Sequence, residues 1–334
     1  MKPIIMKFGG YSLAEIEKIK IAAERVSLAR KKGHPVILVL SAPADITDDL
    51  NKLATRALGT NKPIKKSIKR ELSALLIAGE QISISLMAML LNKQGTKASS
   101  FNAWQAEIIT EENHTQAEIL KIKTKNINTA LNKGFVAVVA GFQGINKLGE
   151  ATTLGRGGSD LTAVALALAF KAEICELYTD VKGIYTTNPS INPKAKKIKY
   201  ITYTELKELS SCGAEVRQLK AIDFAKKHKI KLHIRSAFHN QTGTIVSSKK
   251  PTLSKKNIPA CITLKRKKDL SKVYIIGQDL NNNKDILPLI NKLAKEAKIT
   301  FKKIKISFHK IEITTRFSQG DKLLNLLHKA FFKA

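Results

Sequence analysis

The chain has 334 residues, of which 43% are hydrophobic, and it carries a formal net charge of +31. This length predicts about two domains, and no apolar run approaches the roughly 18 residues that a membrane-spanning helix needs. Three scattered cysteines and seven histidines in no metal-like spacing argue against a disulfide scaffold and a protein-held transition metal. We therefore expect a cytoplasmic protein without a metal site of its own and without a membrane partner.

The excess positive charge comes mostly from lysine, because only nine of the 58 basic residues are arginine. The lysines are spread along the chain and do not form one block, and aromatic residues make up 6% of the chain. Sequence-specific nucleic-acid sites usually combine arginine with aromatic stacking surfaces. The composition therefore argues against a specific nucleic-acid partner, while attraction of anionic substrates fits it.

The N-terminal part repeats a strand, a Gly- or Ser-containing loop and a helix. Residues 3–8 and 34–41 are predicted strands, and a helix is predicted over residues 14–32. Residues 71–93 are predicted to form one long helix with Glu80 in its middle. This alternation indicates an α/β fold, in which functional residues gather at the carboxyl ends of parallel strands.

The middle of the chain contains a Gly-rich turn, Thr152–Asp160, that opens an apolar helix over residues 161–170. Such a turn presents free backbone N–H groups and the positive end of the helix dipole. Arg156 adds a planar fork suited to a carboxylate or a phosphate. The turn therefore predicts anion binding, either of a substrate or of a nucleotide. Buried strands are predicted on both sides, over residues 135–144 and 174–178.

The C-terminal part has a different pattern. Its predicted order of strand, helix, two strands and helix is close to a ferredoxin-like α+β module. We interpret it as a dimerising or regulatory unit, with a purely structural tail as the alternative. The module's predicted segments are strands over 272–277, 302–307 and 310–316 and helices over 286–298 and 322–332. The residues before it are predicted to form helices over 204–212 and 215–229 and strands over 231–236 and 242–246.

Phosphoryl transfer requires a cation near the moving phosphoryl, backbone donors for its oxygens and a carboxylate. The predicted strand ends supply such a set. The sequence lacks the spacing of a P-loop and of a dinucleotide-binding Gly-x-Gly-x-x-Gly, which disfavours a P-loop kinase and a Rossmann dehydrogenase. The set consists of Lys7, Ser41, Arg156, Ser159, Asp160 and Asp180.

The opening Lys7-Phe-Gly-Gly-Tyr-Ser12 resembles the Lys-Phe-Gly-Gly-Thr-Ser of aspartate kinases. The turn at residues 152–160 matches the same family closely. Further motifs fall in that family's order over residues 1–246, and the tail resembles a single ACT-type module where the family usually has two. These motifs are Ser41-Ala, Thr47-Asp48, Gly79-Glu80, Gly141–Gly144, Tyr178–Asp180, Gly183–Thr186 and Gly243-Thr244.

The resemblance implies a three-layer α/β/α amino-acid-kinase domain over residues 1–246, a linker over 247–260 and an ACT-like module over 261–334. It implies ATP-dependent phosphorylation of the L-aspartate side chain to 4-phospho-L-aspartate, the first step toward lysine, diaminopimelate, threonine and methionine. Mg²⁺ would be held mainly by the nucleotide, and a homodimer would form through the C-terminal module.

The resemblance also implies residue roles. Lys7 and Asp160 would be catalytic. The aspartate site would contain Thr47, Glu80, Arg156, Gly157, Gly158 and Ser159, with Glu80 facing the ammonium group and Arg156 a carboxylate. The nucleotide site would contain Lys7, Phe8, Gly9, Gly10, Ser41, Tyr178, Thr179, Asp180, Ile184, Tyr185, Thr186, Thr187, Asn188 and Pro189.

The chain departs from the family pattern mostly on the nucleotide side, which predicts weaker ATP binding. An Asn-rich segment, 278–284, predicts weak or absent inhibition by lysine. Three alternatives remain open: another amino-acid-kinase enzyme, a non-catalytic regulator with a degenerate nucleotide site, and a basic nucleic-acid binder. The departures are Tyr11, Lys182, Asn188, Glu215 and Gln218-Leu219.

Overall fold

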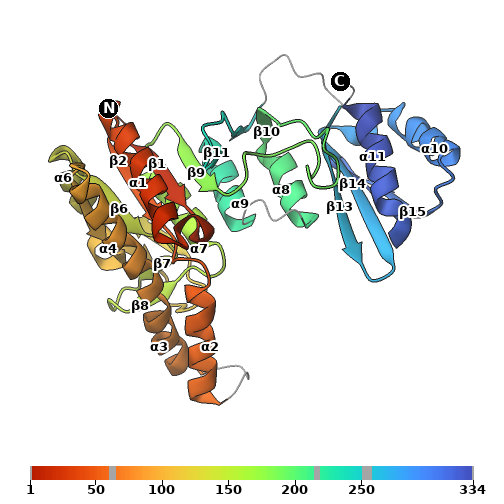
Figure 1. Cartoon of the computed structure of the whole chain (residues 1–334). Helices are drawn as coiled ribbons and strands as arrows, with labels where there is room; N and C mark the ends of the chain where they lie inside the picture. The colour runs from red at the N-terminus through yellow and green to blue at the C-terminus, as the bar shows by residue number, and fades with distance from the viewer. Residues whose placement is uncertain (1, 60–64, 214–218, 250–257, 333–334) are drawn as a thin grey trace. The chain divides into compact units, whose positions relative to one another are not determined.

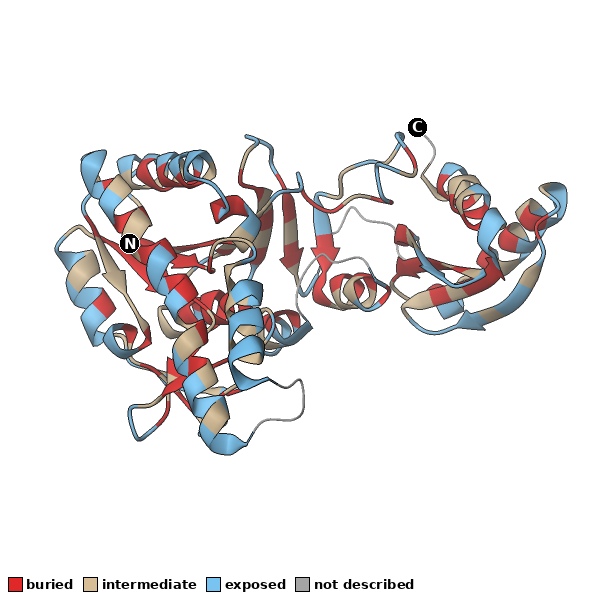
Figure 2. Cartoon of the chain, turned by 60° about the horizontal axis from the view of Figure 1, so that its bottom comes forward, coloured by how far each residue is buried: buried red, intermediate tan, exposed pale blue. Residues whose placement is uncertain are grey.

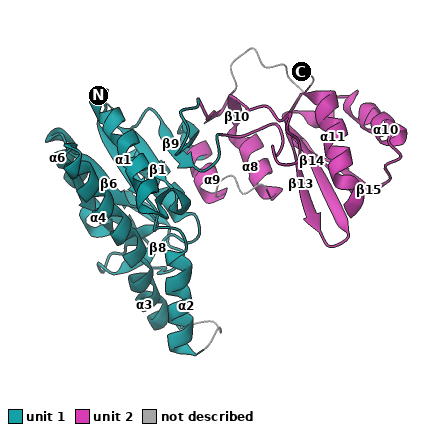
Figure 3. Ribbon diagram, viewed as in Figure 1, with its two compact units in different colours: residues 1–182, 227–241 teal, residues 183–226, 242–334 magenta. Residues whose placement is uncertain are grey.

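The computed structural model describes residues 2–59, 65–213, 219–249 and 258–332. The chain forms two compact units, shown in Figure 3. The first consists of Met1–Lys182 and Lys227–Gln241, and the second of Gly183–Lys226 and Thr242–Ala334. Each has its own hydrophobic core. The sequence departures Glu215 and Gln218 lie outside the described residues.

A parallel sheet forms the centre of the first unit, with the strand order β11-β9-β1-β2-β6-β3 (Figure 1). Strands β2 and β6 are apolar and fully buried, as expected for parallel strands covered on both faces. The strands are β1 (Ile4–Phe8), β2 (Val36–Leu40), β3 (Ala98–Phe101), β6 (Val136–Ala140), β9 (Cys175–Thr179) and β11 (Leu232–Ser236).

Helices cover both faces of this sheet. Met6 and Phe8 of β1 share one core with apolar residues of α1 (Ile16–Lys31) and α4 (Ala78–Lys93). Because successive strand residues point to opposite faces, Lys7 faces the other side, where α7 (Gly158–Ala169) packs against β1. The structure confirms the predicted three-layer α/β/α arrangement, and Figure 2 shows buried residues concentrated along the strands and the helix faces toward them.

A smaller sheet in the first unit holds the chain that leads into the Gly-rich turn. Its order is β5-β4-β7-β8, and β8 runs directly into the residues before α7. The Thr110 and Thr152 hydroxyls are hydrogen-bonded at 2.7 Å, which ties β4 to β8. The strands are β4 (Ile108–Thr110), β5 (Ile119–Ile122), β7 (Gln143–Ile145) and β8 (Ala151–Thr153), with α5 (Ala103–Ala106) beside them. The helix α6 (Lys125–Asn132) packs against β6 of the larger sheet.

The helix predicted over residues 71–93 is two helices, α3 (Lys66–Leu76) and α4, which meet at Ile77. Together, Lys66–Lys93 are long and apolar enough to pass a length-and-composition test for a membrane span, which the sequence reading did not anticipate. Of the most apolar window, 44% is buried inside the structure. Ile84, Met87 and Leu91 are fully buried in the core of the first unit, so α4 serves as a core helix.

The second unit contains a parallel pair, β10 (Tyr200–Thr202) and β12 (Thr244–Ser247), and a four-stranded antiparallel sheet. The sheet has the order β13-β14-β16-β15, and α10 (Ile286–Glu296) and α11 (Gly320–Phe331) share its hydrophobic core. The sheet and its helices fit the predicted ACT-like module, with β13 as a strand that the sequence reading missed. The other elements are α8 (Tyr203–Ser211), α9 (Leu219–His228), β13 (Pro259–Lys267), β14 (Leu270–Gly277), β15 (Phe301–Ile306) and β16 (Lys310–Arg316).

Candidate active site

Lys7 and Asp160 form a buried ion pair at the carboxyl end of β1. The Lys7 Nζ lies 2.6 Å from the Asp160 Oδ1, and the two residues are 6% and 4% exposed. Asp160 belongs to the first turn of α7, so the Gly-rich turn brings its carboxylate to the amine of the first strand. The pair therefore fixes a cation at the edge of the sheet where the sequence predicted function.

Three strand-end loops meet close to this pair. After β1, the Gly10 carbonyl accepts a hydrogen bond from the Ala44 N–H at 3.1 Å. A Cβ at Gly10 would lie 2.9 Å from the Ala42 carbonyl oxygen, which follows β2. A Cβ at Gly141, which follows β6, would lie 2.6 Å from the Ser159 Cβ. Glycine is required at both positions because the neighbouring backbones approach so closely.

Glu80 is buried beside the loop after β2, in the first turn of α4. Its Oε1 accepts a hydrogen bond from the Ala42 N–H at 2.9 Å. Its Oε2 is buried with no hydrogen-bond partner among the described residues. Burial raises the pKa of this carboxyl to about 7, although the Ala42 and Glu80 N–H groups and the charge of Lys7 oppose the rise. A buried oxygen without a partner is costly, so this atom is suited to a cationic ligand.

The turn between β8 and α7 presents Arg156 to solvent. Gly157 adopts the left-handed conformation, with φ 76°, and forms the N-cap of α7. Arg156 is exposed and makes no ion pair or hydrogen bond with any residue that the structure describes. Arg156 lies in the turn that leads into α7, four positions before Asp160, the ion-pair partner of Lys7. Ser159 is buried next to Gly141, and Gly158 donates its N–H to the Gly155 carbonyl at 2.9 Å.

The remaining residues of the predicted aspartate and phosphate sites lie on the neighbouring loops. Ser41 is half-buried after β2, and its N–H is hydrogen-bonded to the Phe8 carbonyl at 3.3 Å. Thr47 is half-buried in the first turn of α2 (Ile46–Leu58). A Cβ at Gly9 would lie 3.6 Å from the Lys7 Nζ, so the absent side chain leaves that approach to the amine open.

Tyr178 is a core residue of the sheet in this structure. Its ring stacks on Phe8 with a centroid distance of 4.4 Å and an interplanar angle of 6°. It is 3% exposed, and its hydroxyl donates to the Glu176 Oε2 at 2.8 Å. Burial, with the nearby Glu176 carboxylate, raises the pKa of Tyr178. Thr179 and Asp180 follow at the end of β9, where the Thr179 hydroxyl donates to the Asp180 Oδ1 at 2.8 Å.

The rest of the predicted nucleotide site belongs to the second unit. The segment Ile184–Pro189 pairs with the chain that returns at residues 196–198: Thr186 donates its N–H to the Lys196 carbonyl, and Ile198 to the Ile184 carbonyl, both at 2.8 Å. The Thr187 hydroxyl is buried and has no hydrogen-bond partner within the described ranges. Tyr185 is half-buried, while Asn188 and Pro189 are exposed.

Residues 2–236 match the protein family described as "Amino acid kinase family". The chain belongs to the amino acid kinase family. Among curated relatives, it is 48% identical over 243 residues to an aspartokinase of Geobacillus stearothermophilus, covering 73% of this chain and 58% of that relative. It is 42% identical over 247 residues to an aspartokinase of Mycobacterium bovis, covering 74% of this chain and 57% of that relative. The aligned part thus spans just under three fifths of the length of these relatives.

Solved structures share the fold of this amino acid kinase over nearly its whole length. E. coli aspartokinase III in complex with aspartate and ADP superposes with a TM-score of 0.77 at 20% identity, covering 99% of this chain and all of that one. Clostridium acetobutylicum aspartate kinase gives a TM-score of 0.76 at 18% identity, covering 98% of this chain and 100% of that chain. These likenesses establish the fold, including the C-terminal antiparallel sheet.

Sequence reasoning on this amino acid kinase missed a half-buried charged cluster around Glu176. Arg235 donates to the Glu176 Oε1 at 2.8 Å, and the His233 Nδ1 lies 3.5 Å from the same oxygen. Burial alone would raise the pKa of Glu176. The His233 hydrogen bond and the Arg235 charge outweigh burial and lower this pKa to about 2. The signal was the alternation of polar and apolar residues in β9 and β11, which places Glu176, Tyr178, His233 and Arg235 on one face. The cluster orients Tyr178.

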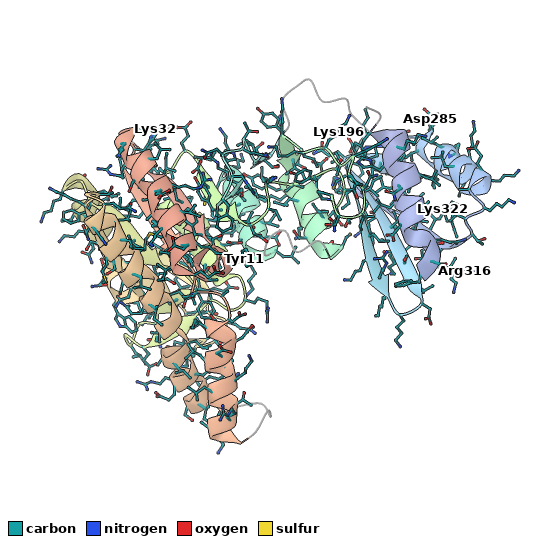
Figure 4. The ribbon with its side chains drawn as sticks, in the orientation of Figure 1. Tyr11, Lys32, Lys196, Asp285, Arg316 and Lys322 are labelled. Carbon is teal, nitrogen blue, oxygen red and sulfur yellow. The ribbon has the colours of Figure 1, made fainter. Side chains whose placement is uncertain are left out.

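Two further features bear on the predicted nucleotide side. Tyr11, labelled in Figure 4, is 57% exposed, and the Lys18 Nζ lies 4.1 Å from its ring centroid. Tyr11, which departs from the family pattern, therefore packs with α1 and does not contact the Lys7–Asp160 pair.

Among the residues that the structure describes, no group of three or more His, Cys, Asp or Glu side chains is arranged to hold a metal ion.

Proposed function

We propose that the protein transfers the γ-phosphoryl group of ATP to the side-chain carboxylate of L-aspartate and forms 4-phospho-L-aspartate. The observation that carries the proposal is the arrangement around Lys7. The buried Lys7 amine, paired with Asp160, lies close enough to Glu80 for its charge to lower the pKa of the Glu80 carboxyl. One buried oxygen of Glu80 has no hydrogen-bond partner within the described part of the chain. The 42–48% identity to aspartokinases supports the same substrate.

The reaction needs a cation where charge develops on the moving phosphoryl group. The Lys7 ammonium is held for this by its ion pair with Asp160, which fixes the orientation of the amine. An aspartate side-chain oxygen would attack the γ-phosphorus, the bond to the β-phosphate oxygen would break, and ADP would leave. Lys7, with Gly9 and Gly10 beside it, would stabilise the transferring oxygens.

The acceptor would be held at both ends of its amino-acid group. The Glu80 Oε2, which has no hydrogen-bond partner among the described residues, would accept hydrogen bonds from the α-ammonium, and Arg156 would offer a two-pronged donor to the α-carboxylate. Thr47 and Ser159 would add hydroxyl contacts from neighbouring loops, and Gly157 and Gly158 would let the substrate approach the backbone.

ATP would bind to the strand-end loops at Phe8, Ser41 and Thr179–Asp180 of the first unit. The other residues that the resemblance to aspartate kinases implies for the nucleotide, Ile184–Pro189, belong to the second unit. Mg²⁺ would arrive on the phosphates and neutralise part of their charge, since the described carboxylates form no ligand cluster for it. We further propose a cytoplasmic homodimer joined through the C-terminal module, acting at the start of lysine, threonine and methionine biosynthesis. Light scattering on the purified chain tests the dimer.

A substrate panel tests the proposed reaction. ADP release, coupled to NADH oxidation, would be followed with MgATP and aspartate, glutamate, N-acetylglutamate or a nucleoside monophosphate as acceptor. We expect ADP release only when aspartate is the acceptor. ADP release driven by another acceptor would overturn the proposed substrate. Binding of aspartate without turnover would instead indicate a non-catalytic regulator, and a salt-dependent gel shift with RNA would reveal a nucleic-acid binder.

A further inference from the structure

A histidine of the last helix is hydrogen-bonded to the proposed nucleotide segment. The His328 Nε2 of α11 lies 2.8 Å from the Thr186 Oγ1. Both residues are buried, at 2% and 7% exposure, and both belong to the second unit. They are 142 positions apart in the sequence. A buried contact between such distant residues fixes one segment against the other.

Each polar group of Thr186, the N–H, the carbonyl and the hydroxyl, forms a hydrogen bond. Its N–H donates to the Lys196 carbonyl at 2.8 Å, and its carbonyl accepts from the Ile262 N–H at 2.7 Å. Its hydroxyl accepts from the Lys196 N–H at 2.9 Å and meets His328. Ile262 belongs to β13 of the C-terminal sheet, and Ile191 packs against the core of that sheet. The segment around Thr186 is therefore attached to the C-terminal module by backbone, side-chain and apolar contacts.

The hydrogen-bond inventory defines what His328 contributes. A threonine hydroxyl has one hydrogen to donate, and one of its lone pairs is taken by the Lys196 N–H. In its neutral form the His328 ring either accepts this hydrogen at Nε2 or, in the other tautomer, donates its own Nε2 hydrogen to the second lone pair of the hydroxyl. Burial and the nearby positive charge of Lys196 lower the pKa of His328 and favour that form. No other side chain of α11 is bonded to the segment Ile184–Pro189 among the bonds of the described residues.

We propose that His328 is a positioning residue for nucleotide binding: through Thr186 it holds the segment Ile184–Pro189 in the conformation that receives ATP. The inference rests on the proposed function for the identity of the ligand. It gives the C-terminal module a direct part in the nucleotide site, whether or not the module binds an effector. Loss of this bond should loosen the segment and weaken ATP binding without affecting the aspartate site in the first unit.

The kinetic test compares His328→Leu with two variants of the same helix. His328→Gln keeps a side-chain acceptor near the Nε2 position, and Lys329→Gln changes the exposed neighbour. For His328→Leu we expect the KM for ATP to rise about 5- to 15-fold, because one buried hydrogen bond is lost. The kcat and the KM for aspartate should stay within about twofold of their values in the unaltered protein. His328→Gln should recover most of the ATP affinity, and Lys329→Gln should match the unaltered protein.

A second pair of measurements does not depend on turnover. Thr186→Val removes the hydroxyl at nearly constant volume, and with it the bond that the hydroxyl accepts from the Lys196 N–H. The double variant with His328→Leu should therefore be no worse than Thr186→Val alone. Hydrogen–deuterium exchange of residues 184–198 should accelerate in both variants, and titration with a fluorescent ADP analogue should show the same loss of affinity.

The outcomes separate the two proposals. If the unaltered protein binds nucleotide but does not phosphorylate aspartate, the proposed reaction fails while the role of His328 stands. If folded His328→Leu and Thr186→Val keep both the exchange rates and the ADP affinity of the unaltered protein, the positioning role is wrong whatever the substrate. Additive effects in the double variant would also overturn it.

Discussion

Replacing Glu80 by glutamine separates the stability of this protein from its proposed function. Glutamine has nearly the same shape and can still accept the hydrogen bond from the Ala42 N–H, which the carboxylate accepts at 2.9 Å. It removes the charge whose Oε2 has no partner among the described residues. The substitution should therefore relieve an electrostatic penalty in the free protein and weaken the binding of a cationic ligand.

The magnitude of the penalty follows from the pKa. A rise from 4.5 to about 7 makes the ionised form cost about 3 kcal/mol in the folded state. Between pH 4.5 and pH 7 the folded state holds a proton that the unfolded state has released, so stability falls as the pH rises through this window. Glu80→Gln should thus be more stable than the unaltered protein at pH 8 and equally stable near pH 4.

The same change should weaken aspartate binding. A buried hydrogen bond to a charged group contributes about 1.5–3 kcal/mol, which corresponds to a rise of roughly 10- to 150-fold in the KM for aspartate. The KM for ATP should stay within about twofold. Urea unfolding at pH 5 and pH 8, with kinetics at pH 8, measures both effects, and Glu24→Gln on the exposed face of α1 is the control.

An unchanged KM for aspartate in Glu80→Gln would refute the assignment of this carboxylate to the ammonium group. If Glu80→Gln and the unaltered protein lost the same amount of unfolding free energy between pH 5 and pH 8, the account of Glu80 burial would be refuted.

Other substitutions test the site from different sides. Lys7→Met should lower kcat by about 100- to 1000-fold. It should also destabilise the fold by about 3–5 kcal/mol, because Asp160 would be left buried without its cation. Activity near that of the unaltered protein would exclude Lys7 from the chemistry. Gly141→Ala should cost about 1–3 kcal/mol, since its Cβ would lie 2.6 Å from the Ser159 Cβ. Gly9→Ala should leave the melting temperature unchanged, because its Cβ would lie 3.6 Å from the Lys7 Nζ. Equal melting temperatures for Gly141→Ala and Gly9→Ala would contradict this expected difference. Arg156→Lys should leave the melting temperature unchanged, because Arg156 is exposed, yet raise the KM for aspartate about tenfold through loss of the two-pronged donor. Lysine should inhibit weakly or not at all, and half-maximal inhibition at micromolar lysine would disprove that expectation.

The parts of the fold that follow local patterns were predictable from the sequence. The apolar runs at residues 34–41 and 135–144 contain β2 and β6, and the helix after the Gly-rich turn is α7. Their periodicity and glycine punctuation are set by burial on both faces of a parallel sheet. The antiparallel C-terminal sheet was predicted except for β13, whose exposed Lys265–Lys267 end carries no apolar alternation.

The sequence could not show which distant side chains meet. Glu176 and Arg235 are brought together by the register of β9 with β11, and Thr186 meets His328 only through tertiary packing. The motifs placed Lys7 and Asp160 on separate segments, and their 2.6 Å contact depends on how α7 packs on β1. Likewise, the buried state of the Glu80 carboxylate depends on the loop after β2, which folds over it.

Trapping of the acyl phosphate with hydroxylamine tests the central claim most directly. With MgATP, aspartate and hydroxylamine, the purified protein should form aspartyl hydroxamate in step with ADP, and Lys7→Met should form almost none. Nucleotide binding by a folded protein without any hydroxamate, or hydroxamate formed from another amino acid in preference to aspartate, would contradict the claim that Lys7 and Glu80 serve phosphoryl transfer to aspartate.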